Sequence, residues 1–390
     1  MSALVVTEQP SLSATRTRDI DGGSVDSQKN GGFREQTLSQ LRGQQVHIPD
    51  LGKMMQGWQN DQSPHRDAVD GKILEIIQRH SINETVRQRL TKAMLSDQLS
   101  GWYPYAPRQR IEALTSFQAW MFIIDDMIDQ YSLEHNFDFE ALNTLFADCI
   151  DYIKRSLGLL PEGENQAIKY RDHDAVVSFA EYAGVVSQAY SENREYRARL
   201  AKEAIATLEG YRQEAMNRRA GRAPSLEEYL GYRVESSCMM QVVENFEFGN
   251  GLNVPEQVMT SPEMRELYRA TVAVVWIIND IVSMRKEVKE GFVENLVVLL
   301  AHGNAQRGLD AAVSRVQNEI AAVNQAADAA IKSFADTPHG ENVALLAKNC
   351  KNMCMANWLW SMRTPRYCLW DIPPDAEGGY TFTIDEKTNN

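Results

Sequence analysis

Cysteine and histidine are scarce in this sequence, and those present are scattered. The five cysteines, Cys149, Cys238, Cys350, Cys354 and Cys368, are an odd number, which does not suit a disulfide framework. Two of them lie one helical turn apart, but without the CxxC spacing of a zinc or redox site. The seven histidines form no HExxH or comparable cluster. These absences argue against a disulfide-stabilised scaffold and against structural or catalytic zinc.

Basic residues and long apolar runs are also in short supply. The chain has 40 Lys and Arg against 53 Asp and Glu, a formal net charge of -13, and a nucleic-acid groove needs clustered positive charge. No uninterrupted apolar run approaches the ~18 residues of a membrane span. The N-terminus, MSALVVTEQPSLSATRTRD, lacks the pattern of a signal peptide. We therefore expect a cytoplasmic protein without a nucleic-acid partner or stable membrane anchoring.

Alternation typical of strands is missing as well, whereas helical periodicity is widespread. Residues 1–45 are rich in Ser, Thr, Gln, Gly and Asp and have no periodicity, which predicts a disordered tail. Over residues 46–371, apolar side chains recur at three- and four-residue spacing, as in VRQRLTKAMLSDQLSGW, with no repeat or linker. The sequence predicts one all-α domain of helices over this range. Residues 372–390 form a short tail and a candidate cap for the site.

An acidic cluster interrupts one apolar helix, FIIDDMIDQ at residues 122–130. In a helix, Asp125 and Asp129 share a face, while Asp126 points about 100° away. Two carboxylates on one face repel each other unless a cation lies between them, and Mg²⁺ prefers such oxygen ligands. A helix end whose acids face solvent explains DDxxD equally well, so this motif alone leaves both interpretations open.

A second polar cluster follows another apolar run, WIINDIVSMRKEVKEG at residues 276–291. Asn279, Ser283 and Glu287 are spaced four residues apart, so amide, hydroxyl and carboxylate oxygens share one helical stripe. All three can coordinate one Mg²⁺ from a single helix, and Lys286 lies beside them to meet an anion. A solvated surface would rarely order oxygen donors in this way, so the pattern favours a metal site.

Together, DDMID and NDIVSMRKE resemble the two metal motifs of class I terpene cyclases, whose fold is an α-helical barrel. Chain-elongating prenyltransferases carry a second aspartate-rich motif instead. Arg233, in EYLGYRVESSC, precedes Asn279 by 46 residues, where this family places a diphosphate-sensing arginine. Arg366 and Tyr367, in RTPRYCLW, match the family's pair of diphosphate donors. The resemblance extends from about residue 46 to residue 371.

Finer details resemble fungal sesquiterpene cyclases of the presilphiperfolanol and longiborneol types: VHIPDL, GLNVPEQV and KEGFVENLVVLL. One departure follows the sensor arginine. Many bacterial relatives have Asp three residues beyond it and Gly next, whereas this chain has Ser236 and Ser237. The relay from the sensor arginine to the substrate is therefore a weaker part of the resemblance than the arginine itself.

The resemblance implies a role for each motif residue. Three Mg²⁺ ions, with Mn²⁺ as a substitute, are expected on Asp125, Asp129, Asn279, Ser283 and Glu287. The diphosphate is expected on Arg233, Lys286, Arg366 and Tyr367, with Arg233 counted as catalytic. Aromatic faces stabilise carbocations, and the candidate walls are Phe122, Trp360 and, more weakly, Trp276, each with core packing as the alternative. Asp280 is a candidate supporting residue beside the ligands.

The predicted function is that of a Mg²⁺-dependent sesquiterpene cyclase, a monomer or homodimer that ionises farnesyl diphosphate and cyclises the carbocation. One alternative is an isoprenyl diphosphate synthase, which the absence of a second DDxxD disfavours. Another is a non-catalytic helical interaction protein with a degenerate cyclase fold. The intact ligand positions of both motifs disfavour it.

Overall fold

The computed structural model describes residues 27–79, 84–133, 139–161, 176 and 178–385. It confirms the predicted all-α class. Its elements, in chain order, are α1 (Ser27–Leu41), β1 (Gln45–Ile48), α2 (Leu51–Met54), α3 (Arg66–Arg79), α4 (Glu84–Lys92), α5 (Leu95–Trp102), α6 (Arg108–Leu133), α7 (Phe139–Ser156), α10 (Ala180–Ala189), α11 (Arg194–Arg219), α12 (Leu226–Ser236), α13 (Met239–Asn250), α14 (Glu256–Met259), α15 (Pro262–Glu290), α16 (Leu296–Ala301), α17 (Ala305–Phe334), α18 (Gly340–Arg363), the 3₁₀ turn η1 (Pro365–Tyr367) and β2 (Tyr380–Thr383).

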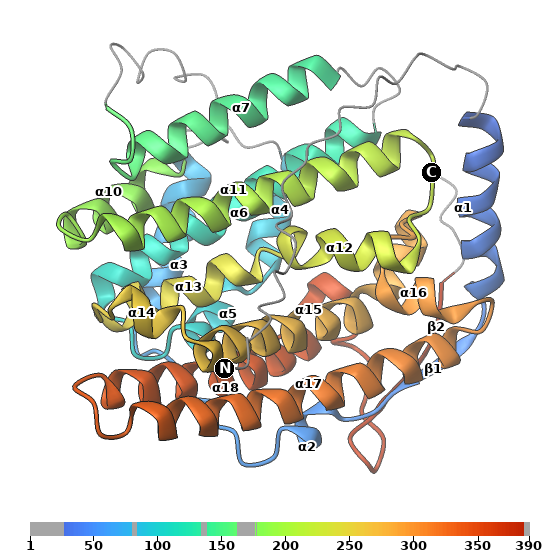
Figure 1. The fold of residues 1–390 in the computed structure, drawn as a ribbon. Coiled ribbons are helices and arrows are strands. Elements are labelled where there is room, and N and C mark those ends of the chain that lie inside the picture. Colours follow the sequence, from blue (N-terminus) through green and yellow to red (C-terminus); the bar gives the residue numbers. More distant parts are fainter. Residues whose placement is uncertain (1–26, 80–83, 134–138, 162–175, 177, 386–390) are drawn as a thin grey trace, which may run out of the picture.

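The long helices lie beside one another in a fixed order. Helix α7 contacts α11, α11 contacts α12, α12 contacts α15, and α15 contacts α17 and α18. Figure 1 shows the same order, with α7 along one edge and α17 along the opposite edge. Helix α15 is therefore the inner element against which the second half of the chain packs.

Helix α15 begins and ends at residues that are typical of helix termini. The Ser261 hydroxyl accepts from the backbone N–H of Met264, Pro262 occupies the first turn, and Gly291 ends the helix at φ 91°. One 18-residue window of α15 is apolar enough to cross a membrane, but 89% of it is buried inside the protein. This is the pattern of a core helix, and it is the only such window in the part of the chain that the structure describes.

A break separates α12 from α13 at the inner wall of the bundle. Ser225 and Glu228 form a capping box that starts α12, and Cys238 turns the chain at φ 63° before α13 begins. Helix α11 packs directly against this break. A Cβ added at Gly210 would lie 2.5 Å from the backbone N of Ser236, so only glycine allows this approach.

The expectation of a disordered tail over residues 1–45 is wrong for residues 27–41. They form α1, which stands at one side of the bundle in Figure 1, with Leu38 and Leu41 buried. Arg34 of α1 makes a two-bonded ion pair with Glu294, at 2.6 and 2.9 Å. The helix has almost no amphipathic pattern of its own, so periodicity gives no sign of it.

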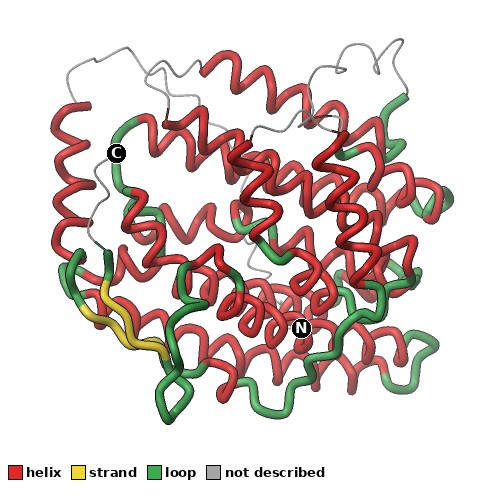
Figure 2. The backbone as a smooth tube through the Cα atoms, turned by 180° about the vertical axis from the view of Figure 1, so that it is seen from behind, coloured by secondary structure: helices red, strands yellow, loops and turns green. Residues whose placement is uncertain are grey.

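A short pair of strands also departs from the expectation of helices alone. Strand β1 pairs antiparallel with β2, placing buried Val46 opposite buried Phe382; Figure 2 shows the pair at the edge of the helical body. Each strand has four residues, too few for alternation to stand out. Residues 372–385, the part of the candidate cap that the structure describes, contribute nothing to the lining of the cavity described below. The proposed cap therefore stays a prediction.

The approach of α11 to the helix break predicts opposite effects for two glycines. Gly210→Ala should lower the free energy of unfolding by about 1–3 kcal/mol, because backbone must shift to admit the methyl group. Gly184→Ala, within α10 where nothing lies within 4 Å, should instead raise it by roughly 0.5–1 kcal/mol. Thermal unfolding of both variants checks this, and equal shifts for both would contradict the close approach.

Candidate active site

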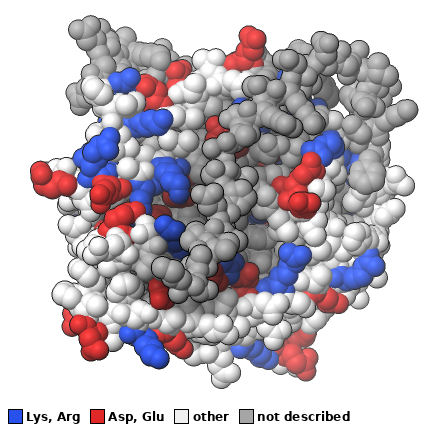
Figure 3. All heavy atoms as spheres, in the orientation of Figure 1, with Lys and Arg blue, Asp and Glu red and all other residues white. Residues whose placement is uncertain are grey.

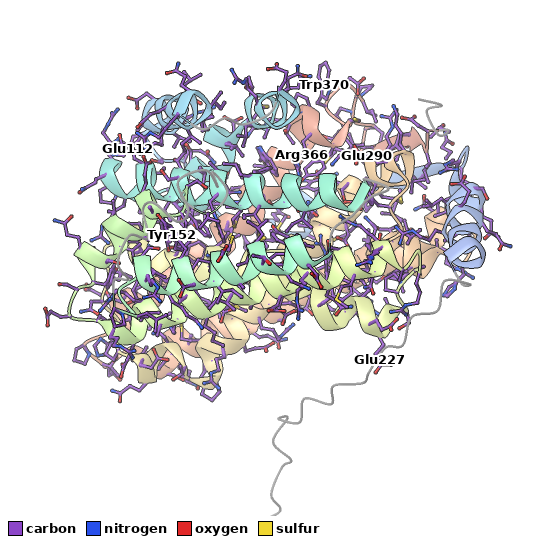
Figure 4. All side chains as sticks on the ribbon, turned by 90° about the horizontal axis from the view of Figure 1, so that it is seen from above. Glu112, Tyr152, Glu227, Glu290, Arg366 and Trp370 are labelled. Atoms are coloured by element: carbon purple, nitrogen blue, oxygen red, sulfur yellow. The ribbon has the colours of Figure 1, made fainter. Side chains whose placement is uncertain are left out.

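A cavity of about 1210 Å³, including its open mouth, lies between α5, α6, α11, the α12–α13 break, α15, α18 and η1. It brings together the predicted residues from both motifs and from the C-terminal half: Phe122, Asp125, Arg233, Asn279, Ser283, Lys286, Glu287, Trp360, Arg366 and Tyr367. In the view of Figure 4, Arg366 and Glu290, two residues of this lining, lie in the upper half. The side chain of Asp129 lies outside the described residues.

Asp125 reaches the cavity from helix α6, where apolar side chains precede it on the same face. Phe117, two turns before Asp125, is fully buried, and its ring lies 4.9 Å from that of Tyr182 on α10. Met121, one turn before Asp125, already faces the cavity. The described part of this stripe is therefore apolar up to Asp125, whose side chain lines the cavity.

Asn279 links three elements across the cavity wall. Its Oδ1 accepts a hydrogen bond from Arg233 Nη2 at 2.9 Å, and its Nδ2 donates to the Tyr367 hydroxyl at 2.8 Å. Arg233 comes from α12, Asn279 from α15 and Tyr367 from η1. Residues that the sequence separates by up to 88 positions are thus joined directly.

Asp280 is the buried partner of the arginine. Its Oδ1 accepts from Arg233 at 2.7 and 3.1 Å, and its Oδ2 accepts from the Tyr229 hydroxyl at 2.5 Å and the Leu296 backbone N–H at 2.8 Å. Burial disfavours the charge on Arg233, but Asp280 and other acidic neighbours raise its pKa. The guanidinium therefore stays charged and fixed beside the cavity.

Glu287 is a partly buried carboxylate without a comparable cation. Its Oε2 accepts from the side-chain amide of Asn295 at 2.8 Å. Burial, reinforced by the nearby charge of Asp280, raises the pKa of Glu287 to about 7. Lys286 turns instead to Glu290, 3.4 Å away. A partly buried carboxylate without a directly paired cation is suited to bind one, so the donor set fits a divalent metal.

The second motif is a mixed donor set. Where the structure describes the chain, no three His, Cys, Asp or Glu side chains gather as a metal cluster. Asn279, Ser283 and Glu287 nevertheless all face the cavity from one stripe of α15. Their amide, hydroxyl and carboxylate oxygens are hard ligands of the kind that Mg²⁺ accepts.

Arg366 and Tyr367 stand opposite the α6 motif. The Arg366 guanidinium lies 4.8 Å from the centre of the Phe122 ring. Burial raises the pKa of Tyr367, so its hydroxyl is neutral and can donate. The Tyr367 ring meets Trp360 edge-on, with ring centres 5.6 Å apart. The predicted donors and the predicted aromatic walls therefore form one continuous surface.

Two further tryptophans face the cavity. Trp276, the weaker of the predicted wall residues, lines it, and so does Trp102 at the end of α5, which the sequence did not single out. Neither indole N–H has a hydrogen-bond partner among the described residues. Trp360 differs, because its indole N–H donates to the Ala93 carbonyl at 2.8 Å. No motif reports the direction of Trp102, since it lies at a helix end.

Sequence reasoning also missed three polar side chains around the site. Tyr229 holds Asp280, Asn295 holds Glu287, and Glu214 of α11 lines the cavity with a pKa raised by burial. Asn295 precedes the apolar run LVVLL, which is a recognisable helix start. That signal predicts a cap for α16, but it does not reveal the contact with Glu287.

One face of the molecule carries surface charges of both signs. In Figure 3, basic and acidic side chains are interspersed over the part of this face that is not grey.

Comparison with known proteins agrees with this geometry. The family model described as "Terpene synthase family 2, C-terminal metal binding" matches residues 116–324, more than half of the chain. The sesquiterpene cyclase hepA of Aspergillus oryzae is 26% identical over 298 residues, covering 73% of this chain and 79% of the relative. The 10-epi-cubebol synthase of Sorangium cellulosum is 28% identical over 279 residues, covering 68% and 80%.

Solved structures show the same fold. Hedycaryol synthase in complex with HEPES superposes with a TM-score of 0.65 at 20% identity, covering 81% of this chain and 98% of that structure. The linalool/nerolidol synthase of Streptomyces clavuligerus, in complex with 2-fluorogeranyl diphosphate, gives 0.65 at 18% identity, covering 80% and 98%. The matched family model therefore places the chain in terpene synthase family 2, as a class I terpene synthase: a metal-binding lyase that acts on a prenyl diphosphate.

Proposed function

We propose that this enzyme is a Mg²⁺-dependent sesquiterpene cyclase that ionises farnesyl diphosphate, cyclises the carbocation to a hydrocarbon or alcohol and releases diphosphate. The observation that carries the proposal is the meeting of Asn279, Ser283 and Glu287 with Arg233 and Tyr367 in one cavity. A cytoplasmic location, the absence of stable membrane anchoring, and a monomeric or homodimeric state belong to the same proposal.

The choice of a fifteen-carbon substrate rests on the relatives. Two of them are named a sesquiterpene cyclase and a 10-epi-cubebol synthase. A third, from Roseiflexus castenholzii, is named (+)-T-muurolol synthase ((2E,6E)-farnesyl diphosphate cyclizing); it is 22% identical over 255 residues, covering 65% of this chain and 73% of the relative. We extend the farnesyl substrate to this chain by that similarity.

We assign three Mg²⁺ ions, with Mn²⁺ as a substitute, to the two motifs. Asp125, with Asp129, is proposed to hold two of the ions, and the stripe on α15 is proposed to hold the third. When bound, the metal stabilises the negative charge of the departing diphosphate. The proposed ligands of the third ion are Asn279, Ser283 and Glu287.

Protein cations complete the proposed diphosphate site. Arg233 and Arg366 border the cavity from different elements, Lys286 lies on α15, and Tyr367 presents a neutral hydroxyl from η1. One ion pair at ~4 Å contributes roughly 4 kcal/mol at an effective dielectric near 20, before desolvation. Several such donors aimed at one leaving group can therefore supply a large part of the stabilisation that ionisation needs.

The remaining walls suit a carbocation because they are aromatic or apolar. Phe122 and Trp360 are the proposed wall residues, and Trp276 and Trp102 extend the same surface. A ring face attracts a cation without offering a nucleophile. Arg366 already occupies a position near the Phe122 ring, which places the diphosphate donor and the wall side by side.

Removing two proposed ligands should abolish catalysis without unfolding the protein. Asn279→Ala/Glu287→Ala is expected to lower turnover of farnesyl diphosphate with Mg²⁺ by roughly 100-fold or more, because transition-state charge loses its support. Purified protein is incubated separately with ten-, fifteen- and twenty-carbon diphosphates, and extracts are analysed by gas chromatography–mass spectrometry. Circular dichroism confirms that the variant is folded.

Other outcomes of the same incubations would indicate a different function or substrate. Longer diphosphates formed from added five-carbon units would identify a chain elongase. No turnover of any substrate, together with a melting temperature that Mg²⁺ and diphosphate leave unchanged, would identify a non-catalytic helical protein. A cyclic product from the twenty-carbon substrate alone would overturn the assignment of farnesyl diphosphate.

Replacing one wall aromatic should redirect the cyclisation. Phe122→Leu is expected to change the product ratio and to lower turnover roughly 3- to 30-fold, because cation–π attraction contributes about 0.5–2 kcal/mol. Phe248→Leu is a matched control, since Phe248 is fully buried and lies outside the cavity lining. It should lower the melting temperature and leave the product ratio unchanged. If Phe122→Leu gave the wild-type product ratio, the assignment of Phe122 to the cavity wall that contacts the carbocation would be wrong.

A further inference from the structure

Asn295 occupies the loop between α15 and α16 and has a fully buried side chain. Its Oδ1 accepts from the backbone N–H groups of Val297 at 2.8 Å and Val298 at 3.4 Å, so it is the N-cap of α16. This half of the side chain has an ordinary structural purpose. It also fixes which way the other half, the amide NH₂ group, must point.

The NH₂ group points at α15. Nδ2 lies 2.8 Å from Glu287 Oε2, 2.7 Å from the Asp280 carbonyl and 3.5 Å from Ser283 Oγ. An amide has two N–H bonds, and the two short contacts use both of them. Asn295 therefore touches two of the three side chains on the oxygen-donor stripe, from outside the helix that carries them.

We propose that Asn295 is a positioning residue for the metal site, an inference that rests on the proposed function of Asn279, Ser283 and Glu287. By binding Oε2 of Glu287, it fixes the carboxylate so that Oε1 is left for a cation. Hydrogen bonds of this kind to metal-binding carboxylates set their orientation and commonly change metal affinity 10- to 100-fold when they are lost.

The neutral amide of Asn295 suits its contact with Glu287 better than a charged side chain would. A lysine or arginine at this place would pair with Glu287 and compete with the metal, whereas an aspartate would repel the carboxylate. An amide N–H orients the carboxylate by its hydrogen bond and adds no positive charge that would compete with a cation. Asparagine is thus suited to orient Glu287 while leaving the carboxylate able to bind a cation.

The loop itself is held from three sides. Arg34 of α1 binds both carboxylate oxygens of Glu294, the residue before Asn295. The next residue, Leu296, donates its backbone N–H to Asp280 at 2.8 Å. The cap of α16 provides the third anchor. Asn295 therefore sits on a rigid support, to which the N-terminal helix contributes directly.

The test is Asn295→Ser, with Asn304→Ser as its matched control. Serine keeps an N-cap acceptor but removes the amide donor. Asn304 is the exposed N-cap of α17, accepting from the Arg307 N–H at 2.9 Å, away from the cavity. The readout is the rise in melting temperature on titrating Mg²⁺ in the presence of inorganic pyrophosphate, measured without substrate.

Asn295→Ser should need about 10-fold more Mg²⁺ for the half-maximal shift, while Asn304→Ser should match the wild type. In a Glu287→Ala background, adding Asn295→Ser should change the Mg²⁺ requirement no further, because the side chain it positions is gone. A purely structural role predicts the opposite: an unchanged Mg²⁺ requirement in the single variant, with only the metal-free melting temperature lowered.

Two results separate this inference from the proposed function. If the wild type shows no shift with Mg²⁺ and pyrophosphate, the proposed metal site itself fails. If the wild type shifts and Asn295→Ser shifts at the same Mg²⁺ concentration, positioning by Asn295 is wrong. Should Asn295→Ser not fold, Arg34→Ala loosens the same loop from outside. A raised Mg²⁺ requirement then supports the inference, and an unchanged one overturns it.

Discussion

The contact between Arg233 and Asp280 is the interaction on which the site depends. Asp280 is almost fully buried, and a buried carboxylate is tolerated only when its oxygens are well bonded. The guanidinium, the Tyr229 hydroxyl and the Leu296 N–H provide four contacts to its two oxygens. Because these donors come from α12 and from the start of α16, and the carboxylate itself belongs to α15, Asp280 fixes the relative position of the three helices.

The contact between Arg233 and Asp280 also positions several neighbouring groups. Arg233 can reach Asn279 because Asp280 holds it, and Asn279 in turn holds Tyr367. On the other side, Leu296 is tied to Asp280, so Asn295 is kept within reach of Glu287. Loss of Asp280 would leave a buried guanidinium uncompensated, which is more costly than the loss of an exposed ion pair.

The sequence predicts the parts of the site that lie on one helix and misses those that depend on packing between helices. Asn279, Ser283 and Glu287 are predictable because helical spacing alone places them on one face. Arg233 and Arg366 come from distant segments, and only the family resemblance indicated that they meet the metal motifs.

Other features have no local pattern to reveal them. The pairing of Asn295 with Glu287 depends on the path of a five-residue loop, and the direction of Trp102 depends on the end of α5. Helix α1 lies in a segment that the sequence predicts to be a disordered tail, because it has almost no amphipathic pattern. Its described contacts include two buried leucines and the ion pair of Arg34. The contact of Gly210 with the α12–α13 break likewise arises between helices. Periodicity reports which face of an element is apolar, whereas these contacts depend on where the neighbouring element lies.

The balance of charge in the network explains why it accommodates a cation. Asp280 and Glu287 are acidic, Arg233 is the cation that binds one of them directly, and Asn279, Asn295, Tyr229 and Tyr367 are neutral. In the structure, Arg233 donates to Asn279 Oδ1, the same atom that is proposed as a metal ligand. Two further contacts hold the guanidinium on Asp280. These two contacts would keep Arg233 in place if Asn279 turned to a metal ion. The Arg233 N–H that now binds Asn279 would then be free at the cavity wall, beside the proposed diphosphate site.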